Sequence, residues 1–84
     1  MARTPQEFRR EFGRRLRRRR HMLGKTQAAI AAAIDMDRVQ YSQMEGGRYQ
    51  AVQLIDLARL GDALQTSLDY LLLRTSDDPG TIPP

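Results

Sequence analysis

The 84-residue chain has no cysteine and no long apolar run. Without cysteine it can form neither a disulfide nor a cysteine-ligated metal site, which fits a reducing cytosol. Its longest apolar run, Ala28 to Ile34, is far short of the roughly 20 residues that span a bilayer. The N-terminal region also lacks the apolar segment of a signal peptide. We therefore expect a soluble cytoplasmic protein.

Groups that could carry out catalysis are equally scarce. The only histidine, His21, lies among arginines, and no Ser/His/Asp or paired-carboxylate spacing is present. The length suits one domain with a modest core and excludes two. We expect a protein that is not an enzyme, with no catalytic residue, metal or cofactor. Since no ligand-binding domain is attached, we also expect no small-molecule ligand.

Acidic residues are rare in the first part of the chain. Residues 1–25 contain ten cationic residues and only two acidic ones, a net charge of +8, whereas residues 26–84 carry a net charge of −4. Such a polarised charge predicts a polyanionic partner, either nucleic acid or a membrane surface.

The arginine-rich stretch is predicted to be a folded amphipathic helix. Its apolar residues share one narrow arc of a helical wheel: Phe8, Phe12, Leu16 and Leu23. Pro5 suits the first turn, and Gly24 suits the left-handed residue that ends a helix. The arginines on the opposite side include Arg17 and Arg18, and they form either a solvated face or a set of phosphate contacts.

Two arginines of this helix fall on or beside its apolar arc. Arg19 lies inside the arc and Arg20 lies at its edge, so their methylene stems should cover apolar surface. At least one of the two is expected to pair with a carboxylate.

Two short helices joined by a tight turn are predicted next. Thr26 is a good N-cap for a helix that ends near Ala33, and Asp35 tolerates a left-handed turn position. Asp37 is a good N-cap for the following helix, with Gln40 placed to complete a capping box. The pair Gly46 and Gly47 ends that helix.

The helix over residues 37–45 has two different faces. Tyr41 and Met44 share the side that should pack inward. The other side carries Arg38, Val39, Ser42 and Gln43. Arginine, glutamine and small apolar groups are the types that read guanine, adenine and the thymine methyl in a major groove. An ordinary polar exterior would also explain this face.

The remaining chain predicts two more helices and a tail. Apolar residues recur with helical spacing over residues 52–64: Leu54, Leu57, Ala58, Gly61 and Leu64. Ser67 is placed to cap a short helix over residues 68–73. We expect one domain over residues 1–74 and a disordered tail over residues 75–84, which is polar and rich in proline.

Together these segments resemble the lambda-repressor-like helix-turn-helix domains, also called Cro or XRE type. The matching pieces are "GRRLRRRR" leading to "LGKTQ", then "TQAAIAAAIDMDRVQYSQMEGG", and finally "SLDYLL", within residues 8–73. The resemblance implies a compact all-α fold of five helices. It also implies a sequence-specific transcription regulator, a repressor or small controller, whose partner is double-stranded DNA and not a membrane.

The resemblance further implies roles for individual residues. The helix over residues 37–45 would enter the major groove. The base-reading residues would be Arg38, Val39 and Gln43. The residues for phosphate or mixed contact would be Gln27, Gln40 and Ser42, in addition to Arg17 and Arg18, which the helical wheel places outward. Arg20 would pair with Glu45, although the wheel alone favours Arg19 for that pairing.

Three departures from the family pattern affect packing. Asp35 stands where the family usually has glycine, Arg19 replaces a usual leucine, and Tyr41 replaces a usual isoleucine. The tyrosine needs a roomier pocket or a partly exposed hydroxyl.

A domain this small presents few base-reading side chains, so we expect a homodimer on an inverted-repeat operator. The apolar residues expected at the dimer interface, together with the fourth helix, are Tyr70, Leu72 and Leu73. Closure of the monomer core is the other interpretation of Leu72. The alternative function is an antitoxin-type protein-binding module that also binds its own operator, but the short polar tail argues against it.

Overall fold

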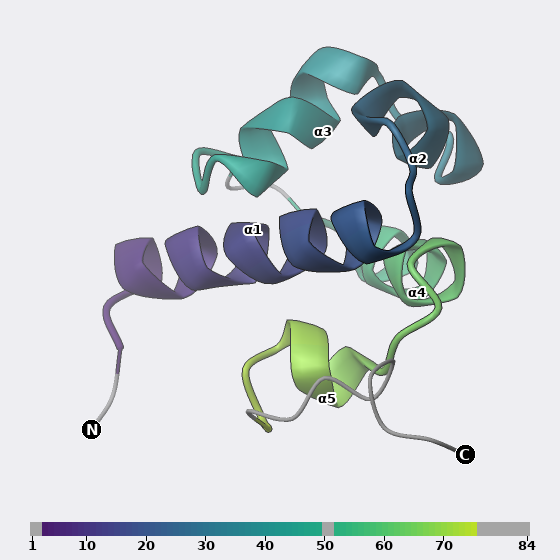
Figure 1. Cartoon of the computed structure of the whole chain (residues 1–84). Helices are drawn as coiled ribbons and strands as arrows, with labels where there is room; N and C mark the ends of the chain where they lie inside the picture. Colours follow the sequence, from purple (N-terminus) through teal and green to yellow (C-terminus); the bar gives the residue numbers. More distant parts are fainter. Residues whose placement is uncertain (1–2, 50–51, 76–84) are drawn as a thin grey trace.

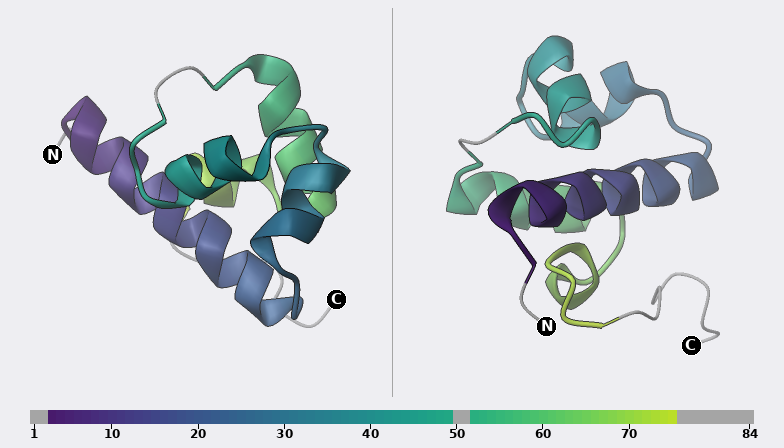
Figure 2. Two further views of the ribbon diagram at one scale, coloured as in Figure 1. Left: turned by 90° about the horizontal axis from the view of Figure 1, so that it is seen from above. Right: turned by 90° about the vertical axis from the view of Figure 1, so that its left-hand side faces the viewer.

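The computed structural model describes residues 3–49 and 52–75, and within them it contains five helices and no strand. The helices are α1 (Pro5–Met22), α2 (Gln27–Ala33), α3 (Arg38–Glu45), α4 (Leu54–Ala63) and α5 (Leu68–Leu71). The long helix α1 lies across the middle, with α2 and α3 on one side and α5 on the other (Figure 1). Both views of Figure 2 show α2 and α3 side by side. The all-α, five-helix class predicted from the sequence is confirmed.

Local sequence signals set the ends of α1. Thr4 and Glu7 form a reciprocal capping box, in which the Glu7 amide donates to Thr4 Oγ1 at 3.1 Å and the Thr4 amide donates to Glu7 Oε1 at 2.9 Å. Pro5 follows as the first helical residue, where its missing N–H costs nothing. Beyond the last turn, Gly24 has a left-handed φ of +65°, as its position in the sequence predicts.

The predicted N-caps of three later helices are also confirmed. Each accepts a hydrogen bond from a backbone N–H two or three residues further on: Thr26, Asp37 and Ser67. At α3 the donor is the Val39 amide, 2.9 Å from Asp37 Oδ2. This bond differs from the capping box expected with Gln40, whose side chain is exposed.

Two helices are shorter than the sequence predicts. Helix α4 lies inside the predicted range of 52–64, and α5 ends at Leu71 instead of reaching Leu73. Leu73 has a left-handed φ of +63°, which cannot continue a right-handed helix. Apart from Thr75, the tail predicted over residues 75–84 lies outside the described residues.

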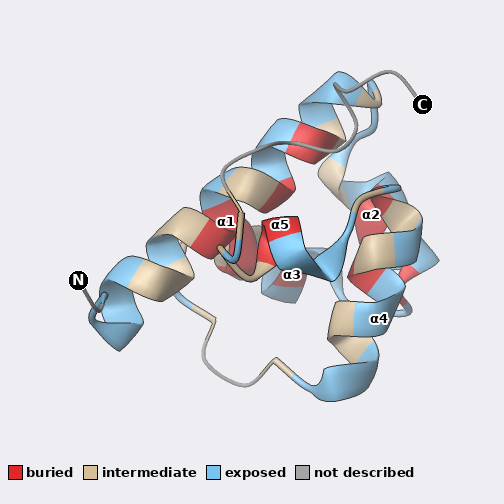
Figure 3. Ribbon diagram, turned by 90° about the horizontal axis from the view of Figure 1, so that it is seen from below, coloured by how far each residue is buried: buried red, intermediate tan, exposed pale blue. Residues whose placement is uncertain are grey.

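All five helices contribute side chains to one core (Figure 3). The buried apolar residues are Phe12, Leu16, Ile30, Ala31, Ile34, Tyr41, Met44, Leu60, Leu64, Tyr70 and Leu71. The buried face of α4 includes Leu64 and the half-buried Leu57, which belong to the apolar pattern that predicts this helix, but also Leu60, which does not. Leu54, the first residue of that pattern, keeps 85% of its surface exposed.

A glycine lets α1 approach the end of α3 closely. Gly13 is buried in α1, and a Cβ atom there would lie 2.5 Å from the carbonyl oxygen of Glu45. No side chain fits into that space without moving backbone. This contact fixes the position of α3 on α1.

Candidate nucleic-acid interface

The outer face of α3 carries the side chains expected to read DNA. Tyr41 and Met44 are buried on its inner face. The residues that keep accessible surface are Arg38, Val39, Gln40, Ser42 and Gln43. Val39 is 52% exposed, which is unusual for a branched apolar side chain. The helix is therefore anchored from inside and presents polar side chains and one apolar group outward.

The turn between α2 and α3 sets the angle at which the two helices meet. Asp35 adopts a left-handed φ of +56° at the position where the resemblance expects glycine. Ile34, just before it, is fully buried, and Met36, just after it, packs against the core. Anchors on both sides of the turn hold α2 and α3 as one unit.

A bidentate ion pair joins the end of α1 to the end of α3. Arg20 Nε lies 2.7 Å from Glu45 Oε2, and Arg20 Nη2 lies 3.0 Å from Glu45 Oε1. The two side chains are only 11% and 4% exposed. Arg20 Nη1 also donates to the carbonyl of Lys25 at 3.0 Å, which ties down the connection that leads into α2. The pairing implied by the resemblance is thus present in the structure.

Arg19, which the wheel alone favours for that pairing, uses backbone acceptors. It is 3% exposed, and its Nε and Nη2 donate to the carbonyls of Leu64 and Gln65 at 3.1 and 2.9 Å. Arg19 therefore ties α1 to the end of α4. The usual leucine at this position could fill the same space but could not satisfy these carbonyls.

Glu45 is also the partner of Gln27, the first residue of α2. Gln27 Nε2 donates to Glu45 Oε1 at 3.0 Å, so one carboxylate joins α1, α2 and α3. Burial raises the pKa of Glu45, but interactions with Arg20, Tyr41 and Gln27 outweigh burial and bring it below its ordinary value. Glu45 is therefore ionised at neutral pH, as its role as a shared acceptor requires.

The tyrosine that replaces the usual isoleucine in α3 is fully buried. Burial, together with the nearby Glu45 carboxylate, raises the pKa of Tyr41, so its hydroxyl stays protonated. The core therefore accommodates this substitution by burying the whole side chain, including the hydroxyl.

Beside the Arg20–Glu45 pair, the surface forms a hollow that is rich in cations. It has a volume of about 350 Å³ and lies between α1, the start of α2 and the end of α3. Its lining residues are Arg17, Arg20, Gln27, Ser42, Glu45, Gly46 and Arg48. Arg17 and Arg48 are exposed there and can reach an anion that rests against α3. The sequence prediction missed Arg48, whose only local signal is its place directly after the paired glycines that end α3.

The structure separates Arg18 from this surface. Arg18 lines a different hollow with Glu11, Arg14, Arg15 and Tyr70, next to α5. Since α5 and α3 lie on opposite sides of α1 (Figure 1), Arg17 and Arg18 cannot act as equivalent phosphate contacts. The two side chains lie in different hollows because one step along a helix turns a side chain by about 100°. The phosphate contact expected of Arg18 stays a prediction, and Arg17 is the arginine that lies beside α3.

The expected place of Tyr70 at a dimer interface is corrected. Tyr70 is 3% exposed, and the Arg15 guanidinium lies 4.6 Å from its ring centroid. Arg15 Nη1 also donates to the Tyr70 carbonyl at 2.6 Å. Tyr70 therefore belongs to the core of the monomer, and the Arg15 guanidinium covers its ring. Leu72 and Leu73 are half-buried.

The apolar surface left exposed lies mainly on α4. Leu54 and Ile55 are 85% and 50% exposed, and Ala58, one turn further on, is exposed too. Leu68 at the start of α5 is 39% exposed, and a Cβ atom on Gly61 would lie 3.3 Å from its side chain. We call Leu54, Ile55, Ala58 and Leu68 the α4 stripe.

Comparison with protein families assigns this architecture. A family model described as "Helix-turn-helix domain" matches residues 11–72, which include all of α2, α3 and α4. The chain belongs to this helix-turn-helix family. It is a DNA-binding domain of the kind found in transcription regulators, and its resemblance to the Cro/XRE type is confirmed.

Two solved structures are similar to this one. The restriction-modification controller protein C.AhdI from Aeromonas hydrophila is 31% identical with a TM-score of 0.68, and the match covers 74% of this chain and 92% of that one. The clp gene regulator ClgR from C. glutamicum is 30% identical with a TM-score of 0.69, and the match covers 79% of this chain and 84% of that one. No curated protein matches.

Residues 3–49 and 52–75 contain no cluster of three or more His, Cys, Asp or Glu side chains that could hold a metal ion. None of the five helices is both long enough and apolar enough to cross a membrane.

Proposed function

We propose that this chain is a sequence-specific transcription regulator, a repressor or small controller, that reads DNA with α3 in the major groove. The observation that carries the proposal is the outer face of α3. It presents Arg38, Val39 and Gln43 while Tyr41 and Met44 hold the helix from inside. A guanidinium, an amide and an exposed apolar group can distinguish base pairs in the major groove.

The cation-rich hollow beside α3 binds the phosphate backbone of the DNA. Arg17 and Arg48, which both line the hollow, reach phosphates, and Ser42 adds a hydroxyl donor. Gln40, exposed on α3, makes a phosphate or base contact. Gln27, at the start of α2, contacts the DNA phosphate backbone. Its hydrogen bond to Glu45 fixes the orientation of the Gln27 side chain.

The regulator acts as a homodimer on an inverted-repeat operator. One short recognition helix contacts few base pairs, so two copies are needed for useful specificity. The α4 stripe is the surface that joins them, because it gathers three of the exposed large apolar residues, Leu54, Ile55 and Leu68. Leu72 and Leu73, at the end of α5, extend this contact. The dimer acts in the cytoplasm, by binding and without a catalytic step.

Selection of bound sites from random duplex DNA, with sedimentation of the complex, tests this proposal. The expected product is an inverted repeat whose half-site centres lie about 10 bp, or a small multiple of that, apart, occupied by two chains. Enrichment of no sequence over the starting pool would overturn sequence-specific reading. A single chain bound tightly to one half-site would overturn the dimer.

A further inference from the structure

A third hollow in the molecule plays no part in the proposed DNA interface. It has a volume of about 470 Å³ and opens between the first half of α1, the segment after α3, α4 and the end of α5. Its lining residues are Arg3, Pro5, Phe8, Arg9, Phe12, Met44, Tyr49, Val52, Leu57 and Leu72. We call it the α1–α4 groove. Its size falls in the range of sites that hold small molecules.

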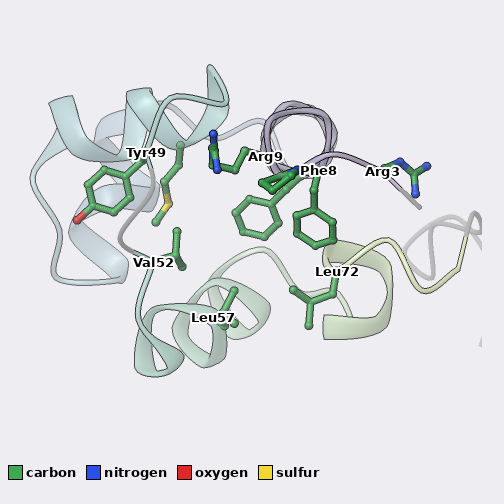
Figure 4. Close-up of a pocket in the computed structure, with 10 residues that line it drawn as sticks. Arg3, Phe8, Arg9, Tyr49, Val52, Leu57 and Leu72 are labelled. Atoms are coloured by element: carbon green, nitrogen blue, oxygen red, sulfur yellow. The ribbon is translucent and has the colours of Figure 1, made fainter. Parts of the chain in front are cut away.

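The walls of the α1–α4 groove are mainly apolar and its charge has one sign. Phe8, Val52, Leu57 and Leu72 surround the opening, and Arg9 lies at its edge (Figure 4). The two charged residues of the lining are both arginines, and no carboxylate is among them. A ligand that complements this groove therefore combines an apolar body with a negative charge.

Arg9 indicates where the negatively charged group of the ligand would bind. Its Nε atom is buried, and no atom of the described residues accepts a hydrogen bond from it. A buried donor without an acceptor is unfavourable, and this one belongs to a permanently charged group. A carboxylate placed at the groove edge would pair with this guanidinium and balance its charge.

We propose that the α1–α4 groove binds an acyl carboxylate, a single apolar chain that ends in one carboxyl group. The carboxylate pairs with Arg9, and the chain lies against Phe8, Leu57 and Leu72. This inference does not depend on the proposed reading of DNA. It also replaces the expectation from the sequence that no small molecule binds.

The groove lies apart from the α4 stripe and shares one residue, Leu72, with the proposed contact between copies. None of the four residues of the α4 stripe lines it. One lining residue, Met44, belongs to the inner face of α3 and is 2% exposed. A ligand in the groove would thus touch the DNA-reading helix from behind.

Titration of the full chain with decanoate, below its micelle concentration, tests the proposal. Calorimetry measures the affinity, and carbon-13 methyl spectra locate the site. We expect saturable binding, with the largest shifts at the methyl groups of Met44, Val52, Leu57 and Leu72. Decanol has the same chain without the charge, and it should bind at least about tenfold more weakly. Decyltrimethylammonium, which carries the opposite charge, should not bind.

Two variants test the role of the arginine. Arg9→Gln should weaken decanoate binding about tenfold or more and leave decanol binding unchanged. Arg14→Gln, on the same helix but outside the groove, should bind decanoate as the wild-type chain does. Circular dichroism must show that both variants are folded.

Three results would overturn the proposal, and two of them need only the wild-type chain. The first is equal binding of decanoate and decanol. The second is a set of methyl shifts that lie only on the α4 stripe or are spread over no single site. A groove that another copy of the chain already covers would also give this second result. The third is an equal loss of decanoate binding in Arg9→Gln and Arg14→Gln.

Discussion

Arg20 and Glu45 are joined by two hydrogen bonds, of 2.7 and 3.0 Å, between the last turn of α1 and the last residue of α3. Both side chains are largely buried, and Gln27 adds a third bond to the same carboxylate. The pair therefore connects the helix that carries most of the positive charge to the helix proposed to read DNA.

Removal of Arg20 should destabilise the fold strongly. Arg20→Ala leaves the Glu45 carboxylate buried without its cation, and we expect the free energy of unfolding to fall by about 3 kcal/mol. Arg17→Ala removes an exposed arginine from the same helix and should cost about 0.5 kcal/mol or less. Urea unfolding of both variants measures the difference, and equal midpoints would show that the ion pair does not support the fold.

Stability should fall in acid partly through Glu45. Its pKa is lowered in the folded state, so its contribution is complete above the ordinary carboxyl pKa of 4.5 and is lost as the pH drops through the lower, folded value. Glu45→Gln should be less stable than the wild type at pH 7, and the gap should narrow as the pH falls below 4.5.

Glu7 must be separated from this effect. The hydrogen bonds with Thr4 lower the pKa of Glu7, so it shifts stability in the same direction. Glu7→Gln serves as the matched control, because it removes a carboxylate that is exposed and has no part in the junction of α1 and α3. A gap between Glu45→Gln and the wild type that stays constant from pH 7 to pH 3 would contradict the role assigned to Glu45.

Gly13→Ala should destabilise the protein although it improves helix propensity. Alanine in place of glycine inside a helix normally gains roughly 0.5–1 kcal/mol. Here the added Cβ would lie 2.5 Å from the Glu45 carbonyl oxygen, so we expect a loss of about 1–3 kcal/mol from overpacking. Gly46→Ala is the control, since a Cβ there would lie 3.4 Å from the flexible Arg48 side chain. A higher melting temperature for Gly13→Ala would refute the close contact.

A charge on the α4 stripe should prevent the proposed homodimer. Leu54 is 85% exposed, so Leu54→Lys should leave the monomer folded and shift the sedimenting species from dimer to monomer. Ala33→Lys adds the same charge at an exposed position of α2 and should remain dimeric. If both variants sediment as the wild type does, the α4 stripe is not the interface.

Features set by neighbouring residues could be predicted from the sequence. The N-caps at Thr26 and Asp37 and the left-handed residues Gly24 and Asp35 depend on local backbone chemistry, and the structure has all four as predicted. The inward face of α3 was also predictable. The helix has few apolar residues, and the two large ones, Tyr41 and Met44, lie on the same side.

Features set by distant partners could not be predicted. Apolar residues cover more than half of α4, so the wheel could not choose between a buried face at Leu60 and one at Leu54. Arg15 caps the ring of Tyr70, which lies 55 residues further along the chain. Arg17 and Arg18 are adjacent in the sequence and line different hollows beside α1, a difference that depends on where α3 and α5 pack.

The last prediction distinguishes recognition of the DNA bases from binding to the DNA phosphate backbone. Gln43 lies on the outer face of α3 and Arg17 lies in the cation-rich hollow. Gln43→Ala should cost about 1–3 kcal/mol on the selected operator and much less on a scrambled duplex, because an amide contact to a base edge is lost. Arg17→Ala should weaken both duplexes alike and reduce the slope of log affinity against log salt by about 1.

Fluorescence anisotropy with both duplexes at two salt concentrations distinguishes these effects, once circular dichroism has shown that each variant is folded. Arg18→Ala is the matched control for Arg17→Ala, because its side chain faces α5 and should leave affinity and salt slope close to those of the wild type. If Gln43→Ala loses affinity equally on both duplexes, or loses none, the outer face of α3 does not read bases. If Arg18→Ala flattens the salt dependence as much as Arg17→Ala does, the DNA lies along a different side of α1 from the one proposed.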